Sequence, residues 1–584
     1  MVSQLSRMRI LLSLALLVAL ATSAQAFDHL EISVVNPHMV SGRPAVTVRT
    51  TFSVHVRAVN GDGTTDTTAD FINADLASPD VAANLPGAMY LQNGERQFDG
   101  VEFLAAGRPV RLQVSDADDA SVPTAEVLID CYRPVDRFAV SVPVGTKYVD
   151  QAIASTIVAL DVQGDPVLNF RDDVVLLAEV GHFSTGLSIT VPGASFADGE
   201  VVQNVTFWGT DPVTRENTLY AYGTVQYDGY SEPARGEATV APLLPGPLAD
   251  VVLLLPGEAL TPGVSPGKSG VPSTQTSGAN FSGVSVYAVD QHWNPVQSGP
   301  YPTIDWASDD PDGAVVLPAP AVMGGNPETS YAMTLIRSGT TRVTAAASGA
   351  VTGTSRSDVV INPEGLDHFE FDTGIWNPAD LQVTTIPFNI RIVARDANGN
   401  VFPLNGQVSL RARIGAADES ADYIITSNNT FVNGQLDAMV QVTKRGFSAY
   451  ILVDSGVVGA SPSFQVNAGP CEKILVTFPG ETWVNGLNDP GFSGNLGVPN
   501  AVTAGDVIDP VTIRPVDRYN NLAPGTRNVT LSCPTGYFEL PDHPSNIVQI
   551  SNPTDIRAVF RTASDAQVLR AESSGLDANS SSQV

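Results

Sequence analysis

Short stretches in which apolar and polar residues alternate recur along the chain. In one of them Phe388, Ile390 and Ile392 are separated by Asn389 and Arg391. Successive side chains of a β-strand point to opposite faces, so this period of two predicts strands that bury one face. No stretch between turn residues keeps the 3.6-residue period of an amphipathic helix. The pattern therefore predicts an all-β protein.

Five of these stretches open in the same way and recur at a regular distance. Each begins with an acidic residue, and apolar residues stand two and four positions further on. The leading acids are Asp28, Asp136, Asp250, Asp367 and Glu472, at intervals of 108, 114, 117 and 105 residues. A repeat of this length matches an immunoglobulin-like (Ig-like) β-sandwich of about 100 residues.

We therefore expect a tandem array of five Ig-like β-sandwich domains, called units 1 to 5 below. Proline fixes φ and lacks an N–H, so it ends the last strand of a domain, and short proline-containing linkers are semi-rigid. Such prolines stand between the units, at Pro134, Pro247, Pro363 and Pro470. The predicted ranges are 27–134, 135–247, 248–364, 365–470 and 471–584.

A second motif returns once in each unit, where an apolar strand runs into an Asp/Asn/Gly turn and then into another apolar residue. Asp, Asn and Gly tolerate positive φ or cap a turn with their side chains. We expect this turn to form the bend between two strands of each sandwich. Its five copies lie at 58–63, 160–167, 288–296, 394–401 and 515–522.

The first 26 residues read as a signal peptide. Arg7 and Arg9 precede an apolar run over 10–21, and Ala24-Gln25-Ala26 forms an A-x-A cleavage site. The alternative is a retained membrane anchor, but that needs about 20 apolar residues, and this run is shorter. We therefore expect a secreted or cell-surface protein.

At the other end, unit 5 stops where its last strand begins, at 580–584. We expect the sequence to be the N-terminal part of a longer protein, with a genuine end and a frayed strand as the alternative.

The charge balance narrows the classes of partner. The 584 residues contain 61 acidic and 31 basic side chains, a formal net charge of −30. Such a charge repels nucleic acid and anionic membranes, so both are poor candidate partners.

The array resembles the bacterial Ig-like repeats of invasin/intimin type. Three stretches of unit 3 carry the resemblance most clearly, namely 256–258 (Pro-Gly-Glu), 267–272 and 288–294. The resemblance implies a β-sandwich and a surface-associated protein, and it carries over no catalytic residue. Unit 1 departs from the pattern, because Asn60 stands where the other turns have Asp.

Two acidic loops have the residue types of a calcium site. Asp396, Asn398 and Asn400 alternate on a tight turn, and Asp309, Asp310 and Asp312 form a similar cluster. An EF-hand needs a later glycine and an acid at its twelfth position, but Gly399 comes early and the twelfth residue is Gln407. The preferred interpretation is a plain turn, with no cofactor. Calcium held between units by the leading acids is a minority hypothesis.

Cys471 and Cys533 both belong to unit 5, and Cys533 continues the inward-facing positions of Val529 and Leu531. They form either a disulfide or two buried free thiols, and Cys131 is left over.

Catalysis finds little support in the sequence. The seven histidines show no ligand spacing, and there is no G-x-S-x-G motif. The stretch 263–269 is no phosphate loop, because only three residues separate its glycines and one of them is proline.

The sequence thus predicts a non-enzymatic, secreted or cell-surface structural or adhesive rod whose partner is a protein or glycan on a surface. The alternatives are the stalk of a longer secreted enzyme and a calcium-dependent carbohydrate-binding array.

Overall fold

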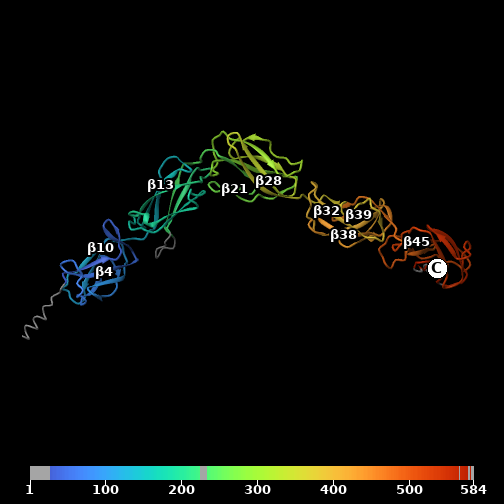
Figure 1. Cartoon of the computed structure of the whole chain (residues 1–584), viewed down its shortest axis with the longest axis horizontal. Helices are drawn as coiled ribbons and strands as arrows, with labels where there is room; N and C mark the ends of the chain where they lie inside the picture. The colour runs from blue at the N-terminus through green and yellow to red at the C-terminus, as the bar shows by residue number, and fades with distance from the viewer. Residues whose placement is uncertain (1–26, 224–232, 565, 577–578, 581–584) are drawn as a thin grey trace, which may run out of the picture.

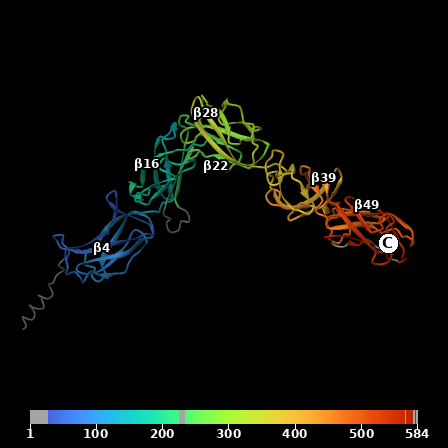
Figure 2. The same ribbon diagram turned by 45° about the vertical axis from the view of Figure 1, so that its right-hand side comes forward.

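A computed structural model shows five β-sandwiches that follow one another along an arch (Figures 1 and 2). It describes residues 27–223, 233–564, 566–576 and 579–580. The predicted signal segment, with Ala24 and Ala26, and residues 581–584 lie outside this part. The described residues contain β-strands and two short 3-10 helices, η1 (Gly193–Ser195) and η2 (Ala421–Tyr423). The predicted all-β array of five Ig-like sandwiches is therefore confirmed.

Unit 1 has one four-stranded and one six-stranded sheet. The four-stranded sheet has the spatial order β1 (His29–Val34), β4 (Thr51–Val59), β8 (Glu95–Phe103), β6 (Ala83–Asn84). The six-stranded sheet has the order β2 (His38–Val40), β3 (Arg43–Thr47), β10 (Ala125–Tyr132), β9 (Gly107–Asp116), β5 (Asn73–Ala77), β7 (Met89–Tyr90).

In unit 2 the two layers join into one seven-stranded sheet, because β11 and β18 pair at a single position, Arg137 with Arg235. The order is β15 (Ser188–Val191), β14 (Val174–Ala178), β17 (Asn217–Gly223), β18 (Arg235–Val240), β11 (Arg137–Ser141), β13 (Ala152–Leu160), β16 (Glu200–Thr206), with a separate pair β12 (Lys147–Tyr148), β19 (Leu243–Leu244).

Unit 3 has a three-stranded and a five-stranded sheet and an additional hairpin. The three-stranded sheet has the order β20 (Asp250–Leu254), β24 (Asn280–Val289), β27 (Glu328–Thr334). The five-stranded sheet has the order β23 (Gln275–Thr276), β29 (Gly353–Asn362), β28 (Gly339–Ser348), β25 (Thr303–Ser308), β26 (Ala321–Val322). The hairpin pairs β21 (Glu258–Leu260) with β22 (Lys268–Gly270).

Unit 4 repeats the two-sheet plan without that hairpin. The first sheet has the order β30 (His368–Phe371), β32 (Phe388–Arg395), β38 (Gln435–Val442), β36 (Ile424–Thr426). The second has the order β31 (Gln382–Val383), β41 (Phe464–Asn467), β39 (Gly446–Asp454), β34 (Ser409–Ile414), β35 (Asp418–Ser420), and β40 (Val458–Ala460) also pairs with β39. A small separate pair consists of β33 (Gly406–Gln407) and β37 (Thr430–Phe431).

Unit 5 again carries the hairpin, here β43 (Glu481–Trp483) with β44 (Asn495–Gly497). One sheet has the order β42 (Lys473–Thr477), β45 (Val507–Val516), β49 (Thr554–Phe560), β47 (Phe538–Glu539). The other has the order β48 (Ile547–Ile550), β46 (Arg527–Ser532), β50 (Arg570–Ser573), β51 (Asn579–Ser580).

The alternating pattern maps onto these strands as the sequence predicts. In β32, Ile390 and Ile392 are buried, whereas Asn389 is exposed and Arg391 half-buried. The five acid-led stretches form β1, β11, β20, β30 and β42, and each pairs antiparallel with the strand that ends at the turn motif. Each unit buries its own apolar cluster, so each can hold its sheets together by packing.

The turn motif is the predicted bend between strands. In the first unit it follows β4 and leads towards β5, which belongs to the opposite sheet. The backbone closes it the same way each time, because the first residue donates its N–H to the carbonyl four residues on. These five bonds are 2.8–3.0 Å long and join Asn60 to Thr64, Asp161 to Asp165, Asp290 to Asn294, Asp396 to Asn400 and Asp517 to Asn521.

Candidate functional site

The turn motif lies at the end of each sandwich that faces the preceding unit. In units 3, 4 and 5 its aspartates, Asp290, Asp396 and Asp517, are 1%, 0% and 0% exposed. Carboxylates are almost never buried so fully unless every oxygen is satisfied. Their burial therefore marks the junctions between units as the sites where buried polar chemistry is concentrated.

The aspartate ties the turn to the linker. In unit 3, Asp290 Oδ1 accepts the N–H groups of His292 at 2.8 Å and Asn294 at 3.0 Å, and Oδ2 accepts the linker N–H of Gly246 at 2.7 Å. Asp396 does the same for the linker residue Glu364 at 3.0 Å, and Asp517 for Gly469 at 3.0 Å. Charge-assisted bonds of this kind are stronger than neutral ones, so the linker enters each of these units at a fixed point.

The asparagine of the turn reaches across to the preceding unit. Its side-chain oxygen accepts a backbone N–H of that unit, and its side-chain NH₂ group donates to a backbone carbonyl of the same unit. The residue with the carbonyl stands two positions before the residue with the N–H, so the amide takes both groups as the backbone of a neighbouring strand would. Asn294 binds Thr210 N–H at 2.9 Å and Trp208 C=O at 2.7 Å. Asn521 repeats both contacts with Arg445 N–H at 3.0 Å and Thr443 C=O at 2.8 Å.

Unit 4 completes the series. Asn400 accepts the N–H of Ser338 at 2.7 Å and donates to the carbonyl of Ile336 at 2.9 Å. The receiving loops lie at matching places, between β16 and β17, β27 and β28, and β38 and β39. We call this set of bonds the Asp–Asn lock. It comprises the turn Asp with the linker N–H, and the turn Asn with the two backbone groups of the preceding unit.

The lock of junction 3–4 favours the ionised form of Asp396. Burial by itself raises the pKa of Asp396, but hydrogen bonds from the Asn400 amide and from the N–H groups of Glu364, Asn400 and Asn398 outweigh it, so the pKa is lowered below 3.8. The carboxylate is therefore ionised at neutral pH, as the lock requires.

Junction 1–2 is built differently. Asp165 stands in the place of the lock asparagine, and a carboxylate cannot donate to a carbonyl. It lies 4.0 Å from Arg108 instead, while Asp161 lies 3.3 Å from the linker residue Arg133. Apolar packing joins these units, since Val40 of unit 1 belongs to the same buried cluster as the core of unit 2.

In unit 1 no preceding unit packs against the turn within the described residues. Asn60 is half-buried and Thr64 is exposed, and the Asn60 amide binds the Thr64 hydroxyl at 3.2 Å. This explains why the turn of unit 1 departs from the others in sequence.

Junction 2–3 adds a hairpin to the lock. The tip of the β21–β22 hairpin reaches back to unit 2, where a Cβ on Gly263 would stand 2.6 Å from the Cα of Gly209. Arg215 of unit 2 donates to the carbonyl of Pro295 at 2.9 Å. His292 stacks on Trp208 with ring centroids 4.7 Å apart, and its Nε2 lies 2.8 Å from Asp150.

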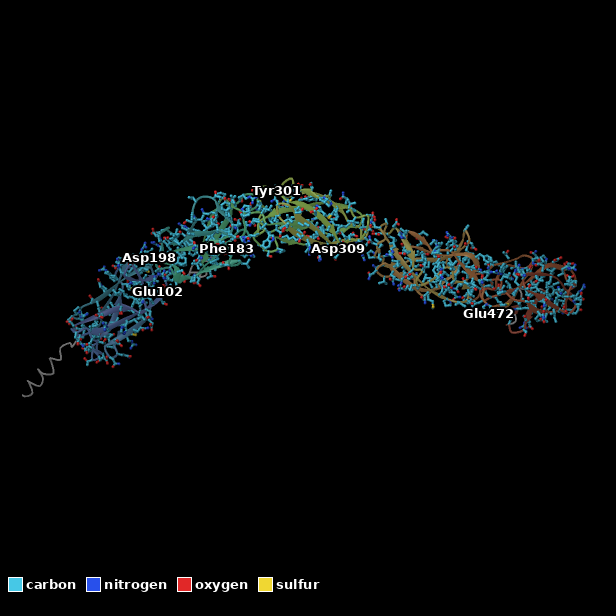
Figure 3. The ribbon with its side chains drawn as sticks, turned by 45° about the horizontal axis from the view of Figure 1, so that its top comes forward. Glu102, Phe183, Asp198, Tyr301, Asp309 and Glu472 are labelled. Atoms are coloured by element: carbon cyan, nitrogen blue, oxygen red, sulfur yellow. The ribbon has the colours of Figure 1, made fainter. Side chains whose placement is uncertain are left out.

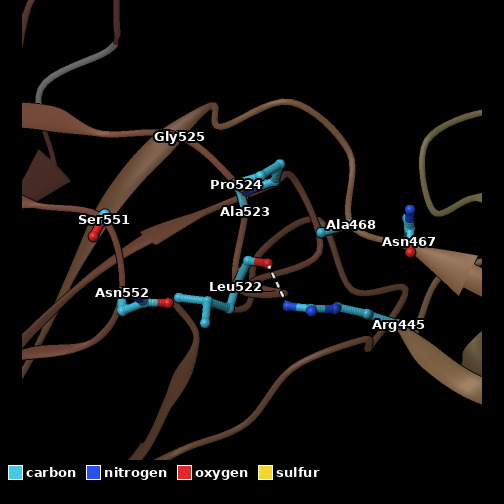
Figure 4. A pocket seen from close by; sticks show the side chains of 9 residues that line it. All are labelled: Arg445, Asn467, Ala468, Leu522, Ala523, Pro524, Gly525, Ser551 and Asn552. Atoms are coloured by element: carbon cyan, nitrogen blue, oxygen red, sulfur yellow. Dashed lines mark hydrogen bonds between the residues drawn. The ribbon is translucent and has the colours of Figure 1, made fainter.

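Junction 4–5 repeats that plan with other residues. The tip of the β43–β44 hairpin binds unit 4 through Gly486 C=O, which accepts from the Thr443 hydroxyl at 2.5 Å, and through Asn488 N–H, which donates to Asp422 C=O at 3.0 Å. Arg445 donates to the carbonyl of Leu522 at 3.1 Å beside a polar pocket of about 330 Å³ (Figure 4).

Junction 3–4 has the lock but no hairpin. A buried serine of unit 3, Ser277, accepts the amides of Asn398 at 3.0 Å and Asn400 at 2.9 Å. Among the residues that the structure describes, no ion pair, ring contact or apolar cluster joins these two units.

The residues considered for calcium are engaged by protein groups. Asp396, Asn398 and Asn400 belong to the lock of junction 3–4. In the other loop the carboxylates accept backbone N–H groups, namely Asp309 from Arg342, Asp310 from Asp312, Ile336 and Arg337, and Asp312 from Ala314. Within the described ranges no three His, Cys, Asp or Glu side chains are grouped so that they could hold a metal ion.

The leading acids of the units make local contacts. Figure 3 labels one of them, Glu472, at the start of unit 5. Their closest partners are neighbours in sequence or across the turn, namely Arg137 for Asp136, Val251 N–H for Asp250, His368 for Asp367 and Arg518 for Glu472.

Of the two alternatives for Cys471 and Cys533, the structure has two free thiols, with Cys471 buried and Cys533 half-buried. Cys471 precedes β42 near the start of β46, whereas Cys533 follows the other end of β46 and contacts Gln567. Six residues of strand separate the two ends by about 20 Å, far beyond the roughly 7 Å between Cα atoms that a disulfide spans. The period-two pattern predicts which face of the sheet Cys533 points to, but it does not show near which end of the strand each cysteine lies. Burial raises the pKa of the third thiol, Cys131, to about 12.

The contacts across the junctions are what sequence reasoning missed. The turn was predicted only as a bend within a unit, and its asparagine had no assigned partner. The available signal was the pair Asp and Asn four residues apart in units 3, 4 and 5, where two polar side chains recur at the spacing of whole domains.

Comparison with known proteins returned structural similarities only. No protein-family model matches the chain, and no curated protein sequence matches it. Similar solved structures include the bacterial integrin-binding protein invasin (14% identity, 76% of this chain and 78% of that chain, TM-score 0.24) and the adhesin FdeC of Escherichia coli (15%, 58% and 99%, 0.22). Domains 1–6 of the surface layer protein SbsC match at 13% identity over 95% of this chain and 67% of that chain, with a TM-score of 0.19. At these identities and TM-scores the similarities carry no argument about function.

No helix among the described residues has the length and apolar character to cross a membrane.

Proposed function

We propose that the protein is a non-enzymatic structural or adhesive rod that is secreted or held at a cell surface. It keeps a partner or a further domain at a distance, and it binds a protein or glycan on a surface through exposed loops. Weak contacts repeated along an array of this kind add up through effective concentration.

The observation that carries the proposal is the Asp–Asn lock. Domains in tandem move independently by default unless their interfaces are large or specifically bonded. Here three successive junctions, at Asn294, Asn400 and Asn521, use the same side-chain bonds to backbone groups of the preceding unit. Such bonds hold the end of each sandwich against the preceding unit, so the units follow one another as a spacer requires.

The surface properties agree with this role. A formal net charge of −30 keeps neighbouring copies apart and favours an extended, soluble array. Five sandwiches with strands of about 30 Å give a contour of about 150–200 Å.

The test is the thickness of a surface layer. The chain is anchored at low density through a tag before residue 27, and the height of a fluorophore at the other end is measured by interference microscopy. We expect a height of the order of 100 Å or more, reduced in a variant with Asn294, Asn400 and Asn521 all replaced by alanine. A wild-type height of only a few tens of ångströms would contradict the role of a spacer.

A further inference from the structure

The four junctions do not have equal numbers of contacts, and the difference follows from one segment of each unit. In units 3 and 5 the chain between the first strand (β20 or β42) and the strand that ends at the turn motif (β24 or β45) forms a hairpin, β21–β22 or β43–β44, whose tip contacts the preceding unit. Junctions 2–3 and 4–5 therefore each have two attachment points, the lock and the hairpin tip.

Unit 4 uses the same segment for its own core. Residues 372–381, between β30 and β31, contain Trp376, which is 4% exposed. Its ring packs against Phe388 at 5.6 Å and Phe464 at 5.0 Å, both in unit 4. Trp376 anchors the segment on its own unit, and among the described residues the segment forms no hydrogen bond, ion pair or ring contact with unit 3.

A second contact is also missing at junction 3–4. At the other two locked junctions an arginine of the preceding unit, Arg215 or Arg445, donates to the carbonyl that follows the lock asparagine. The residue after Asn400 is Val401, which is 41% exposed, whereas its counterparts Pro295 and Leu522 are buried and half-buried. The far side of the unit 4 turn therefore faces solvent.

What remains at junction 3–4 is a small polar contact around Ser277. Ser277 is 1% exposed, accepts two amide groups from unit 4 and donates to the carbonyl of Ile336. Asn400 adds its bonds to Ser338 and Ile336. All of these bonds lie close together, so rotation about them displaces little buried surface.

We propose that junction 3–4 is the hinge of the array, and that units 2–3 and units 4–5 move as two rigid pairs about it. Two attachment points fix both the position and the angle of a neighbouring body, whereas one point fixes the position only. Hinges in proteins are commonly a few residues between larger rigid bodies. The inference goes beyond the proposed rod, because it gives that rod one defined point of bending.

Distances between pairs of spin labels test the hinge in the full chain. Labels are placed on exposed side chains, with Cys533 replaced by serine, since Cys131 and Cys471 are buried. The three label pairs are Leu187 with Val322, Val322 with Met439, and Met439 with Tyr537, which span junctions 2–3, 3–4 and 4–5. We expect the distance distribution across junction 3–4 to be at least twice as broad as the other two.

A matched pair of variants adds a local control. Ser277→Ala should broaden the distribution across junction 3–4 further and leave the other two unchanged, whereas Ser330→Ala on the surface of unit 3 should change none. Three equally narrow distributions would overturn the hinge and leave the rod intact. Three equally broad distributions would overturn both the hinge and the stiff rod, so the two failures are distinguishable.

Discussion

At the scale of single residues, each lock is built around a buried aspartate whose carboxylate oxygens accept hydrogen bonds. Asp517 is fully buried, and its two oxygens accept N–H groups of the turn, the linker and Asn521, together with the hydroxyl of Thr384 at 2.6 Å. A buried carboxylate costs several kcal/mol when it lacks such partners. The same feature makes the lock sensitive to substitution, because removing one member leaves others unsatisfied.

Replacing Asn521 with alanine should loosen junction 4–5. The change leaves the N–H of Arg445 and the carbonyl of Thr443 without partners, at a cost of about 1–3 kcal/mol for each buried group that water does not reach. We expect amide hydrogen exchange in the loop 443–445 to become about 10-fold faster or more. The control is Asn60→Ala, which alters the exposed turn of unit 1. Equal exchange in the wild type and Asn521→Ala would contradict the lock.

The aspartate of the lock predicts a defined pH dependence. The pKa of Asp396 in the folded chain is lowered below its ordinary value of 3.8, so its contribution to stability is complete above that value and is lost as the pH falls through the folded pKa. Asp396→Asn mimics the neutral form. We expect this variant to melt below the wild type at pH 7 and the difference to shrink below about pH 4. A difference that stays constant from pH 7 to pH 3 would show that ionised Asp396 contributes nothing.

At the scale of elements, the strands build the units and the turns build the junctions. The paired strands make each sandwich, while the turn after strands β24, β32 and β45 joins it to its neighbour. Hairpins β21–β22 and β43–β44 add a second attachment wherever they occur. The stiffness of a junction is therefore decided by short connecting segments and not by the sheets.

The contact of the unit 3 hairpin depends on the absence of a side chain. A Cβ on Gly263 would lie 2.6 Å from both the N and the Cα of Gly209, and neither backbone atom can move aside easily. Gly263→Ala should therefore separate the hairpin from unit 2, at a cost of about 1–3 kcal/mol for overpacking. The measurement is the label distance across junction 2–3, which we expect to lengthen and broaden.

Gly349→Ala is the matched control for this substitution. Both glycines have positive φ, +72° at Gly263 and +93° at Gly349, but a Cβ on Gly349 would meet nothing within 4 Å. Any effect of backbone strain alone appears in both variants. If both variants shift the distance across junction 2–3 equally, the hairpin contact is not what positions the two units.

The strands could be predicted from sequence because their signal is local. The alternating pattern, as at Ile390 and Ile392, can be recognised from neighbouring positions alone, and so can the acid-led first strands. The structure confirms both predictions. The partners of the lock could not be predicted in this way. Asn521 binds Thr443, which is 78 residues earlier in the chain, and nothing in either segment alone identifies the other. The sequence left the state of Cys471 and Cys533 open for the same reason, because register within a strand does not give distance along a sandwich.

At the scale of the whole molecule, the sandwiches follow one another along an arch and do not fold back on one another (Figures 1 and 2). Among the residues that the structure describes, each unit contacts only its neighbours, so the shape of the array follows from the geometry of the four junctions. Three of these use the Asp–Asn lock, at Asp290–Asn294, Asp396–Asn400 and Asp517–Asn521. The central claim is that these polar contacts keep the array extended.

Small-angle X-ray scattering tests that claim most directly, with the wild type compared against a variant carrying Asn294→Ala, Asn400→Ala and Asn521→Ala. The account predicts a long, extended particle for the wild type, with bending at junction 3–4. For the variant it predicts a flexible chain of folded units, with a changed maximum dimension and an unchanged content of β-structure. Scattering curves that superimpose for the two proteins would contradict the account, because the orientation of the units would then not depend on the lock.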